Sequence, residues 1–159
     1  MATVEQDVRI ERGSSDDLDA VMTVMDSAFG RRFGEAWTRS QLAGILPMGG
    51  VSLMLANDPR SSETVGFSLF RTVADESELL LLAVLPSQQR RGVGGLLLDH
   101  FVEAGREYGL RRVHLEVRDG NPAIGMYQRA GFCPVGRRRN YYHASSGKAY
   151  DAITLACQL

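Results

Sequence analysis

Hydrophobic residues recur along the chain with two periods, one typical of helices and one typical of strands. The helical period, together with capping residues, predicts four helices. They are expected at residues 18–29 after the polar run 14–17, at a short segment between Thr38 and Pro47, at 94–108, and at a short segment that starts at Asn121 and stops at Gly131.

The period of two predicts seven strands around these helices. They are expected at residues 8–12, 51–56, 64–73, 78–85, 111–117, 133–137 and 150–157. Short turns join the second, third and fourth strands, so these should be antiparallel neighbours, and a polar loop that contains Tyr141 and Tyr142 should join the last two. Since there is no repeat or linker, residues 1–159 are expected to form one mixed α/β domain.

Charge and composition exclude several classes of protein. The formal net charge of −1 argues against binding to bulk nucleic acid, although residues 137–139 form a local basic cluster. Residues 1–11 lack the apolar run of a signal peptide, and no stretch approaches the roughly 20 apolar residues of a membrane span, so the cytoplasm is expected and a membrane partner is not. Cys133 and Cys157 form no CxxC pair and lie near no histidine at metal-ligand spacing, so we expect no metal.

The turn between the fourth strand and the third helix has a chemical signature. It consists of Gln89, Arg90, Arg91, Gly92, Val93, Gly94 and Gly95. Glycines let the backbone approach a ligand, and the free amides and the dipole of a helix start attract anionic oxygens, so a diphosphate fits here. The turn is neither a Walker A loop nor a dinucleotide fingerprint. The alternative is a turn that merely reverses the chain.

The strand expected at residues 111–117 has a polar face. His114, Glu116 and Arg118 alternate with apolar residues and therefore share that face. If helices cover the sheet, Glu116 is a candidate general base, acting directly or through a water molecule. The alternative is a strand at the edge of the sheet whose polar face meets solvent.

Tyr127 lies late in the short helix that follows Asn121. A phenol in this position can donate its proton to a leaving thiolate or hold that thiolate by a hydrogen bond. The alternative is a tyrosine that packs against the core with its hydroxyl in water.

In combination, these segments resemble the GCN5-related N-acetyltransferase (GNAT) superfamily. The resemblance is strongest from Leu79 to Phe132, and it rests on Gln89-Arg90-Arg91-Gly92-Val93-Gly94, Leu115-Glu116-Val117-Arg118, Asn121 with Tyr127, and Gly131-Phe132. It implies an acyl-coenzyme A-dependent N-acetyltransferase that uses acetyl-coenzyme A as co-substrate and no metal. The implied fold is a mostly antiparallel sheet flanked by about four helices, with a splayed pair of parallel strands that holds the coenzyme.

The resemblance also implies roles for individual residues. Glu116 is the implied base and Tyr127 the implied acid, while residues 89–95 hold the pyrophosphate and Asn121 lies on the coenzyme side. The pantetheine is expected to run along Leu82, Ala83 and Val84. A backbone amide near the last two of these would polarise the thioester carbonyl.

Within the superfamily, the chain resembles a bacterial group that acetylates the N-terminal alanine of a ribosomal protein. The matching residues are Leu115-Glu116-Val117-Arg118, then Gly136-Arg137-Arg138-Arg139-Asn140-Tyr141-Tyr142, Gly147 and Asp151-Ala152. The implied acceptor is the α-amine of a protein or peptide N-terminus, with Trp37, Tyr141 and Tyr142 on the substrate side. The chain departs from the group in two places: Asn121 and Tyr127 are one residue closer together, and residues 147–152 lack one acidic residue of an expected Gly-x-Glu-Asp-Ala run.

Two other functions are compatible with the sequence. The first is acetylation of a small-molecule amine, which would use the same residues. The second is a coenzyme A-binding regulatory module without turnover, against which the retention of Glu116 and Tyr127 argues.

Overall fold

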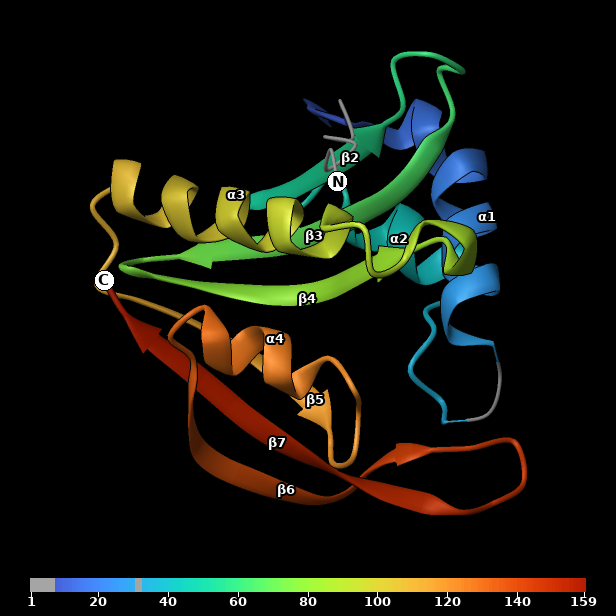
Figure 1. Cartoon of the computed structure of the whole chain (residues 1–159). Coiled ribbons are helices and arrows are strands. Elements are labelled where there is room, and N and C mark those ends of the chain that lie inside the picture. The colour runs from blue at the N-terminus through green and yellow to red at the C-terminus, as the bar shows by residue number, and fades with distance from the viewer. Residues whose placement is uncertain (1–7, 31–32) are drawn as a thin grey trace, which may run out of the picture.

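The structure is a computed structural model that describes residues 8–30 and 33–159. Residues 1–7, which belong to the charged N-terminal segment, and Arg31 and Arg32 of the loop before Trp37 lie outside the described residues. In the described part, seven strands form one sheet in the order β1-β2-β3-β4-β5-β7-β6 (Figure 1).

The elements follow one another as strands with interspersed helices. The strands are β1 (Arg9–Arg12), β2 (Val51–Asn57), β3 (Thr64–Val73), β4 (Glu76–Val84), β5 (Arg112–Arg118), β6 (Cys133–His143) and β7 (Ala149–Gln158). The helices are α1 (Leu18–Phe29), α2 (Arg39–Ile45), α3 (Val93–Glu107) and α4 (Ile124–Arg129), with 3-10 turns η1 (Ser15–Asp17) and η2 (Pro86–Gln88) before α1 and α3.

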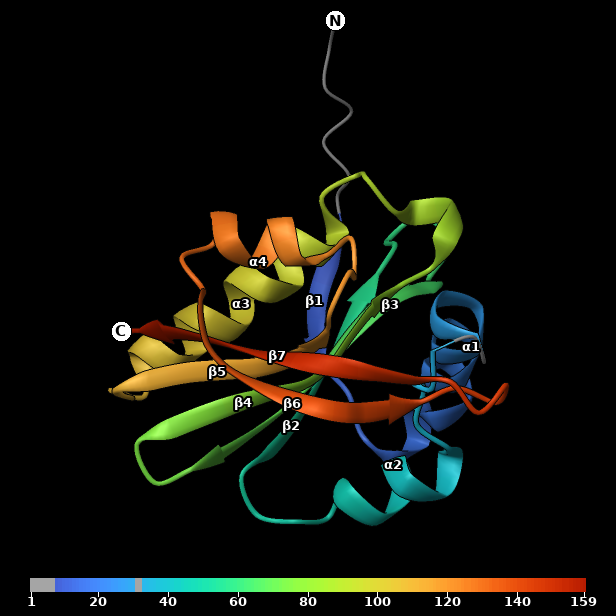
Figure 2. The ribbon, with the colours of Figure 1, turned by 90° about the horizontal axis from the view of Figure 1, so that it is seen from below.

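Helices cover both faces of the sheet. Figure 2 shows α1 and α2 on one face and α3 and α4 on the other. In β2, Leu53 and Leu55 pack into the core under α1, whereas Met54 and Ala56 pack into the core under α3, as the period of two requires. Strands β2, β3 and β4 are antiparallel neighbours, as predicted. The predicted fold class, a mixed and mostly antiparallel sheet with four helices, is confirmed.

The parallel strands β4 and β5 diverge after a short paired stretch. Their register runs from Glu76 opposite Arg112 to Leu79 opposite Leu115 and ends there. The next residue of β4, Leu80, has no partner in the register with β3 and forms a bulge. A bulge bends its strand, so β4 turns away from β5 at the point where their pairing stops. The carboxyl ends of the two strands are therefore separated from each other, as the predicted splay requires.

Near the end of the chain, one predicted loop is a strand in the structure. The segment expected as a polar loop, with Tyr141 and Tyr142, continues β6 to His143, and β7 begins at Ala149. We call the outer part of this hairpin, residues 137–151, the arm. Its β6 side is mostly exposed, so no hydrophobic alternation marks it as a strand. A register shift between Arg138 and Tyr142, with Asn140 at a φ of 53°, further interrupts the strand pattern.

The last helix also starts later than predicted. Asn121 does not begin α4, because its side-chain Oδ1 accepts a hydrogen bond of 2.8 Å from the amide of Ala123 in a turn, and the helix starts at Ile124. Such a turn is typical of asparagine before a helix. Within the described ranges no helix is long and apolar enough to cross a membrane, and those residues do not bring together three metal-ligating side chains.

Candidate functional site

The gap between β4 and β5 opens into a cavity of about 1110 Å³. It extends from the glycine-rich turn before α3, past the ends of the two strands, to the loop before α2 and to the arm. Sites for single small ligands usually measure roughly 300–1,000 Å³, so this cavity is large enough for more than one. The predicted site residues that line it are Trp37, Leu82, Ala83, Val84, Gln89, Arg90, Gly92, Gly94, Gly95, Glu116, Asn121, Tyr127, Tyr141 and Tyr142.

The glycine-rich turn presents unpaired backbone amides to the cavity. Gly92 precedes α3 with a φ of 85°, and the first hydrogen bond of the helix end runs from the amide of Leu96 to the carbonyl of Gly92, at 3.0 Å. The amides of the three residues between them, 93–95, have no partner within the helix. A Cβ atom on Gly95 would meet nothing within 4 Å, so its position is open space beside the cavity. An anionic group fits this end.

The side chains of three residues of the turn lie differently from those of the other turn residues. Val93 is 1% exposed and packs in the core, so only its backbone amide is available to a ligand. Gln89 donates a hydrogen bond of 3.1 Å from Nε2 to the carbonyl of Val84, which ties the turn to the end of β4. Arg91 is exposed and is absent from the lining of the cavity.

Glu116 lies on the cavity wall contributed by β5. Its side chain is 11% exposed, and its Oε1 forms an ion pair of 2.6 Å with Nε of Arg138 in the arm. The hydroxyl of Tyr142 donates to the backbone carbonyl of Glu116 at 3.3 Å. Since β5 lies between β4 and β7, the alternative of a strand at the sheet edge is wrong.

Tyr127 faces the same cavity from α4. It is 7% exposed, and its ring packs edge-on against Phe132. Burial, and secondarily the negative charge of Glu35, raise the pKa of Tyr127 to about 12. The phenol therefore keeps its proton at neutral pH and lines the cavity, while its ring packs against the core.

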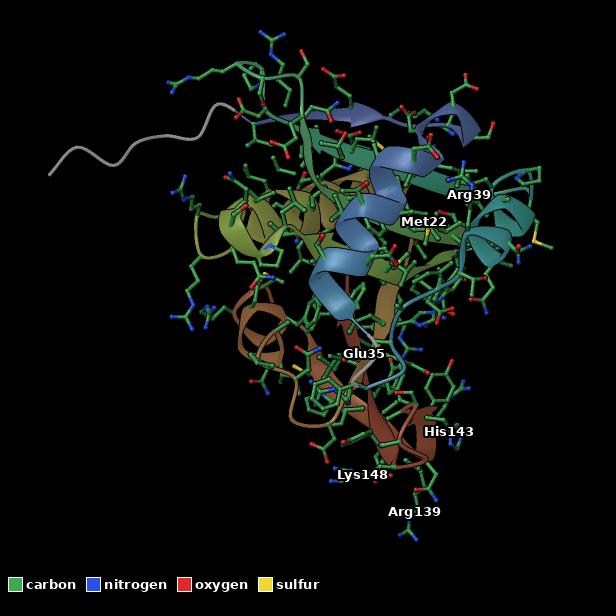
Figure 3. The ribbon with its side chains drawn as sticks, turned by 90° about the vertical axis from the view of Figure 1, so that its right-hand side faces the viewer. Met22, Glu35, Arg39, Arg139, His143 and Lys148 are labelled. Atoms are coloured by element: carbon green, nitrogen blue, oxygen red, sulfur yellow. The ribbon has the colours of Figure 1, made fainter. Side chains whose placement is uncertain are left out.

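Glu35 and Arg118 form a buried ion pair that the sequence patterns did not place in the site. Their side chains are 12% and 9% exposed, and Oε1 of Glu35 lies 3.0 Å from Nε of Arg118. The second carboxylate oxygen of Glu35 accepts a hydrogen bond of 3.1 Å from Nδ2 of Asn121. Glu35 therefore connects the loop before α2 to β5 and to the turn before α4. Figure 3 shows it between α1 and the arm.

Close packing holds this loop against the arm. Gly34 has a φ of 71°, and a Cβ atom there would lie 2.0 Å from the carbonyl oxygen of His143, so only glycine fits. The guanidinium of Arg118 lies 3.6 Å from the centre of the Phe33 ring. A charged residue at the end of an otherwise buried strand was the one sequence signal for this cluster, because a buried charge needs a partner.

The two ends of the cavity differ in charge. Arg90, Arg129 and Asp99 line the end at the glycine-rich turn, whereas Glu35, Glu78, Glu116 and Arg118 line the end at Trp37 and the arm. The first end is therefore net positive and the second net negative. The first end suits a phosphate group and the second suits a cation such as an amine.

Comparison with known proteins agrees with this geometry. The family model described as the acetyltransferase (GNAT) family matches residues 18–132. A ribosomal protein bS18-alanine N-acetyltransferase of Haemophilus influenzae is 38% identical over 99 residues, which cover 62% of this chain and 68% of that protein. The crystal structure of the ribosomal-protein-S18-alanine N-acetyltransferase from Escherichia coli has a TM-score of 0.85 and 28% identity, covering 95% of this chain and 93% of that one.

A more distant structure shows the same fold. Arabidopsis thaliana NAA60, solved in complex with acetyl-CoA, has a TM-score of 0.80 at 20% identity and covers 96% of this chain and 98% of its own. The family match spans more than half of the chain and includes the turn, Glu116 and Tyr127. The acyl-coenzyme A-dependent N-acetyltransferase class expected from the sequence is thereby confirmed. The chain belongs to the acetyltransferase (GNAT) family.

Proposed function

We propose that the protein transfers the acetyl group of acetyl-coenzyme A to the α-amine at the N-terminus of a protein. The proposed acceptor is of the kind that the ribosomal-protein alanine acetyltransferases modify, an N-terminal alanine. One observation carries this proposal: Glu116 and Tyr127 line a single cavity between a glycine-rich turn and an acidic, aromatic mouth. The relatives from Haemophilus influenzae and Escherichia coli, which are named for alanine N-acetylation of a ribosomal protein, support the choice of acceptor. The proposed location is the cytoplasm.

The residues at the turn fit the coenzyme. A Cβ atom on Gly94 would touch Met126 and Leu82 at 3.4–3.8 Å, and at Gly95 it would project into open space, so the glycines keep a cradle free. The amides of residues 93–95 would hold the pyrophosphate, and Arg90 adds positive charge at this end. When bound, the coenzyme supplies an acetyl group activated as a thioester. Backbone amides of β4 near Ala83 and Val84 would face its carbonyl.

Glu116 is the proposed general base. A free α-amine has a pKa near 8, so much of it is protonated at neutral pH and must lose a proton to attack. Glu116 accepts that proton, directly or through water, as the new C–N bond forms. Its place at the acidic end of the cavity matches the charge of an incoming ammonium group.

Tyr127 is the proposed general acid. As the C–S bond breaks, its hydroxyl gives a proton to the departing thiolate. The raised pKa, about 12, keeps that proton in place until the thiolate forms. Protonation of the thiolate completes the balance, because the amine has lost one proton to Glu116 and the thiolate has gained one from Tyr127.

Aromatic side chains at the mouth are the proposed contacts of the acceptor. Trp37 lines the cavity from the loop before α2, and Tyr141 and Tyr142 line it from the arm. Burial raises the pKa of both tyrosines, most strongly that of Tyr142, so their hydroxyls stay protonated. Flat side chains on two sides of an opening suit an extended peptide backbone.

Turnover against a panel of amines tests the proposal. Thiol release from acetyl-coenzyme A is followed with short peptides that begin with alanine, serine or methionine and, in parallel, with polyamines, amino acids and amino sugars. We expect turnover with the alanine peptide and a loss of kcat of roughly 10²–10⁴-fold in Glu116→Gln, the usual range for a general base. Turnover of small amines alone would contradict the proposed acceptor. Coenzyme binding without turnover of any amine would favour the regulatory module.

A further inference from the structure

Arg138, a mostly exposed residue of the arm, contacts the carboxylate of Glu116 on the cavity wall. Its Nε lies 2.6 Å from Oε1, although 62% of the arginine side chain is exposed and only 11% of the glutamate side chain is. Among the described residues this is the one ion pair of Glu116. A largely exposed cation therefore contacts the carboxylate that the proposed reaction needs as its base.

The arm is shaped to hold Arg138 there. Its backbone is bulged between Arg138 and Tyr142, where four steps along β6 span two steps of β7, from Ala152 to Tyr150. Asp151 stabilises the bulge, since its carboxylate accepts hydrogen bonds from the amide of Asn140 at 3.0 Å and from Nη1 of Arg137 at 2.9 Å.

The bulge aims several side chains of the arm at one residue. Burial and the negative charge of Glu116 raise the pKa of Tyr141, and the guanidinium of Arg138 lies 5.5 Å from the centre of the Tyr141 ring. Tyr142 contacts the backbone of Glu116, as described above. Arg138 is thus held over the carboxylate by a stacked ring on the same arm. The conformation of the arm therefore determines where Arg138 lies.

The geometry points to Arg138 as a specificity-determining residue, which occupies Glu116 until the ammonium group of an acceptor replaces it. This inference rests on the proposed function of Glu116 as base. The guanidinium of Arg138 is largely exposed, so it becomes fully hydrated when a second cation takes its place at Glu116. Water carries no charge and would leave the carboxylate without its partner, so water is a poor competitor.

The consequence is protection of the thioester from hydrolysis. If Glu116 were free, it could take a proton from water while the water oxygen bonds to the acetyl carbon, the C–S bond breaks and Tyr127 gives its proton to the departing thiolate. The products would be acetate and the free thiol, and the acetyl group would be lost without an acceptor. Arg138 suppresses this reaction because it fills the position from which Glu116 would accept the proton of water.

Acetyl-coenzyme A alone is the probe that tests the inference. Thiol release without acceptor is compared in the wild type, Arg138→Gln and Arg139→Gln. Arg139 has the same charge on the same strand, forms no ion pair with Glu116 among the described contacts, and points away from the rest of the molecule (Figure 3). We expect hydrolysis to rise roughly fivefold in Arg138→Gln, the equivalent of about 1 kcal/mol for an exposed ion pair, and to stay unchanged in Arg139→Gln.

Two further variants test whether the charge of Arg138 and the base Glu116 cause the change in hydrolysis. Arg138→Lys should restore slow hydrolysis, and Arg138→Gln combined with Glu116→Gln should do the same because the base is gone. With the alanine peptide, Arg138→Gln should lower KM, since the acceptor no longer competes with an internal cation.

Unchanged hydrolysis in Arg138→Gln would overturn the inference. A higher peptide KM in this variant would also overturn it, because Arg138 would then bind the acceptor rather than give way to it. The hydrolysis comparison needs no acceptor, so it stays informative if every peptide in the panel fails. Failure of the proposed acceptor and failure of this inference are therefore separate results.

Discussion

The carboxylate of Glu35 forms a 3.0 Å ion pair with Nε of Arg118, and both side chains are nearly buried. The pair joins the loop before α2 to the end of β5, two segments far apart in the sequence. Removal of one partner leaves the other charge buried and unpaired. We therefore expect Glu35→Ala to lower the free energy of unfolding by roughly 3 kcal/mol, measured by urea denaturation.

A double variant separates pairing from simple loss of packing. Glu35→Ala with Arg118→Met removes both charges and should recover part of the lost stability, because no unpaired charge remains. If the two single losses merely add in the double variant, the ion pair is not what holds this loop.

Ionisation of Tyr127 should not reduce activity at moderately alkaline pH. Its pKa is raised to about 12 by burial and by Glu35, so the acid form persists well above neutrality. We expect kcat to show no fall attributable to this residue up to about pH 10, the ordinary pKa of a tyrosine. Tyr127→Phe should lower kcat by roughly 10²–10⁴-fold with little change in coenzyme affinity. A descending limb in kcat that disappears in Tyr127→Phe, with its midpoint near pH 8, would contradict this assignment.

The same shift predicts the pH dependence of stability. The folded pKa of Tyr127 lies above its unfolded value, so its contribution is complete below about pH 10 and is lost as the pH rises towards 12. Wild type and Tyr127→Phe should therefore differ in the slope of unfolding free energy against pH within this window. Denaturant titrations at several pH values measure that slope, and equal slopes would show that the tyrosine is not perturbed.

A substitution at Gly95 should weaken coenzyme binding without impairing folding. It lies in the first turn of α3, and a Cβ atom added to it would meet no other atom within 4 Å, so Gly95→Ala should not strain the free protein. Alanine in a helix is favoured over glycine by up to about 1 kcal/mol, so stability should hold or rise. The new methyl would enter the proposed cradle, and calorimetry should show weaker binding of acetyl-coenzyme A.

Gly44→Ala is the matched control. Gly44 also lies in a helix, α2, with open space around the position of a Cβ atom, but it does not line the cavity. Its substitution should affect stability in the same direction and leave coenzyme affinity unchanged. Equal coenzyme affinity in Gly95→Ala and wild type would remove the turn from the binding site.

The fold could be predicted largely from local signals. Capping residues such as Ser14 and Thr38 mark the helix starts, and both form capping boxes with the residue three positions later. Alternating apolar residues locate β2 to β5 because each strand is buried on at least one face. The arm escaped prediction because its β6 side is mostly exposed and a bulge breaks its period. The single-domain organisation of residues 1–159 stays a prediction.

The candidate site could be predicted where the motif is continuous in sequence. Gly92, Glu116 and Tyr127 were expected at the cavity and do line it. Glu35 was missed because its importance depends on Arg118 and Asn121, which lie more than 80 positions further along the chain. The contact of Arg138 with Glu116 was also beyond reach, because it depends on the bulge of the arm and not on any spacing in the sequence.

The site of acetylation on a peptide with two kinds of amine tests the central claim most directly. The peptide begins with alanine and carries one internal lysine, and fragment masses after incubation with acetyl-coenzyme A locate the acetyl group. At neutral pH the α-amine, with a pKa near 8, is deprotonated far more often than the lysine amine, with a pKa near 10.4. We predict acetylation of the α-amine alone, lost in Glu116→Gln; acetylation of the lysine, or equal modification by Glu116→Gln, would contradict the account.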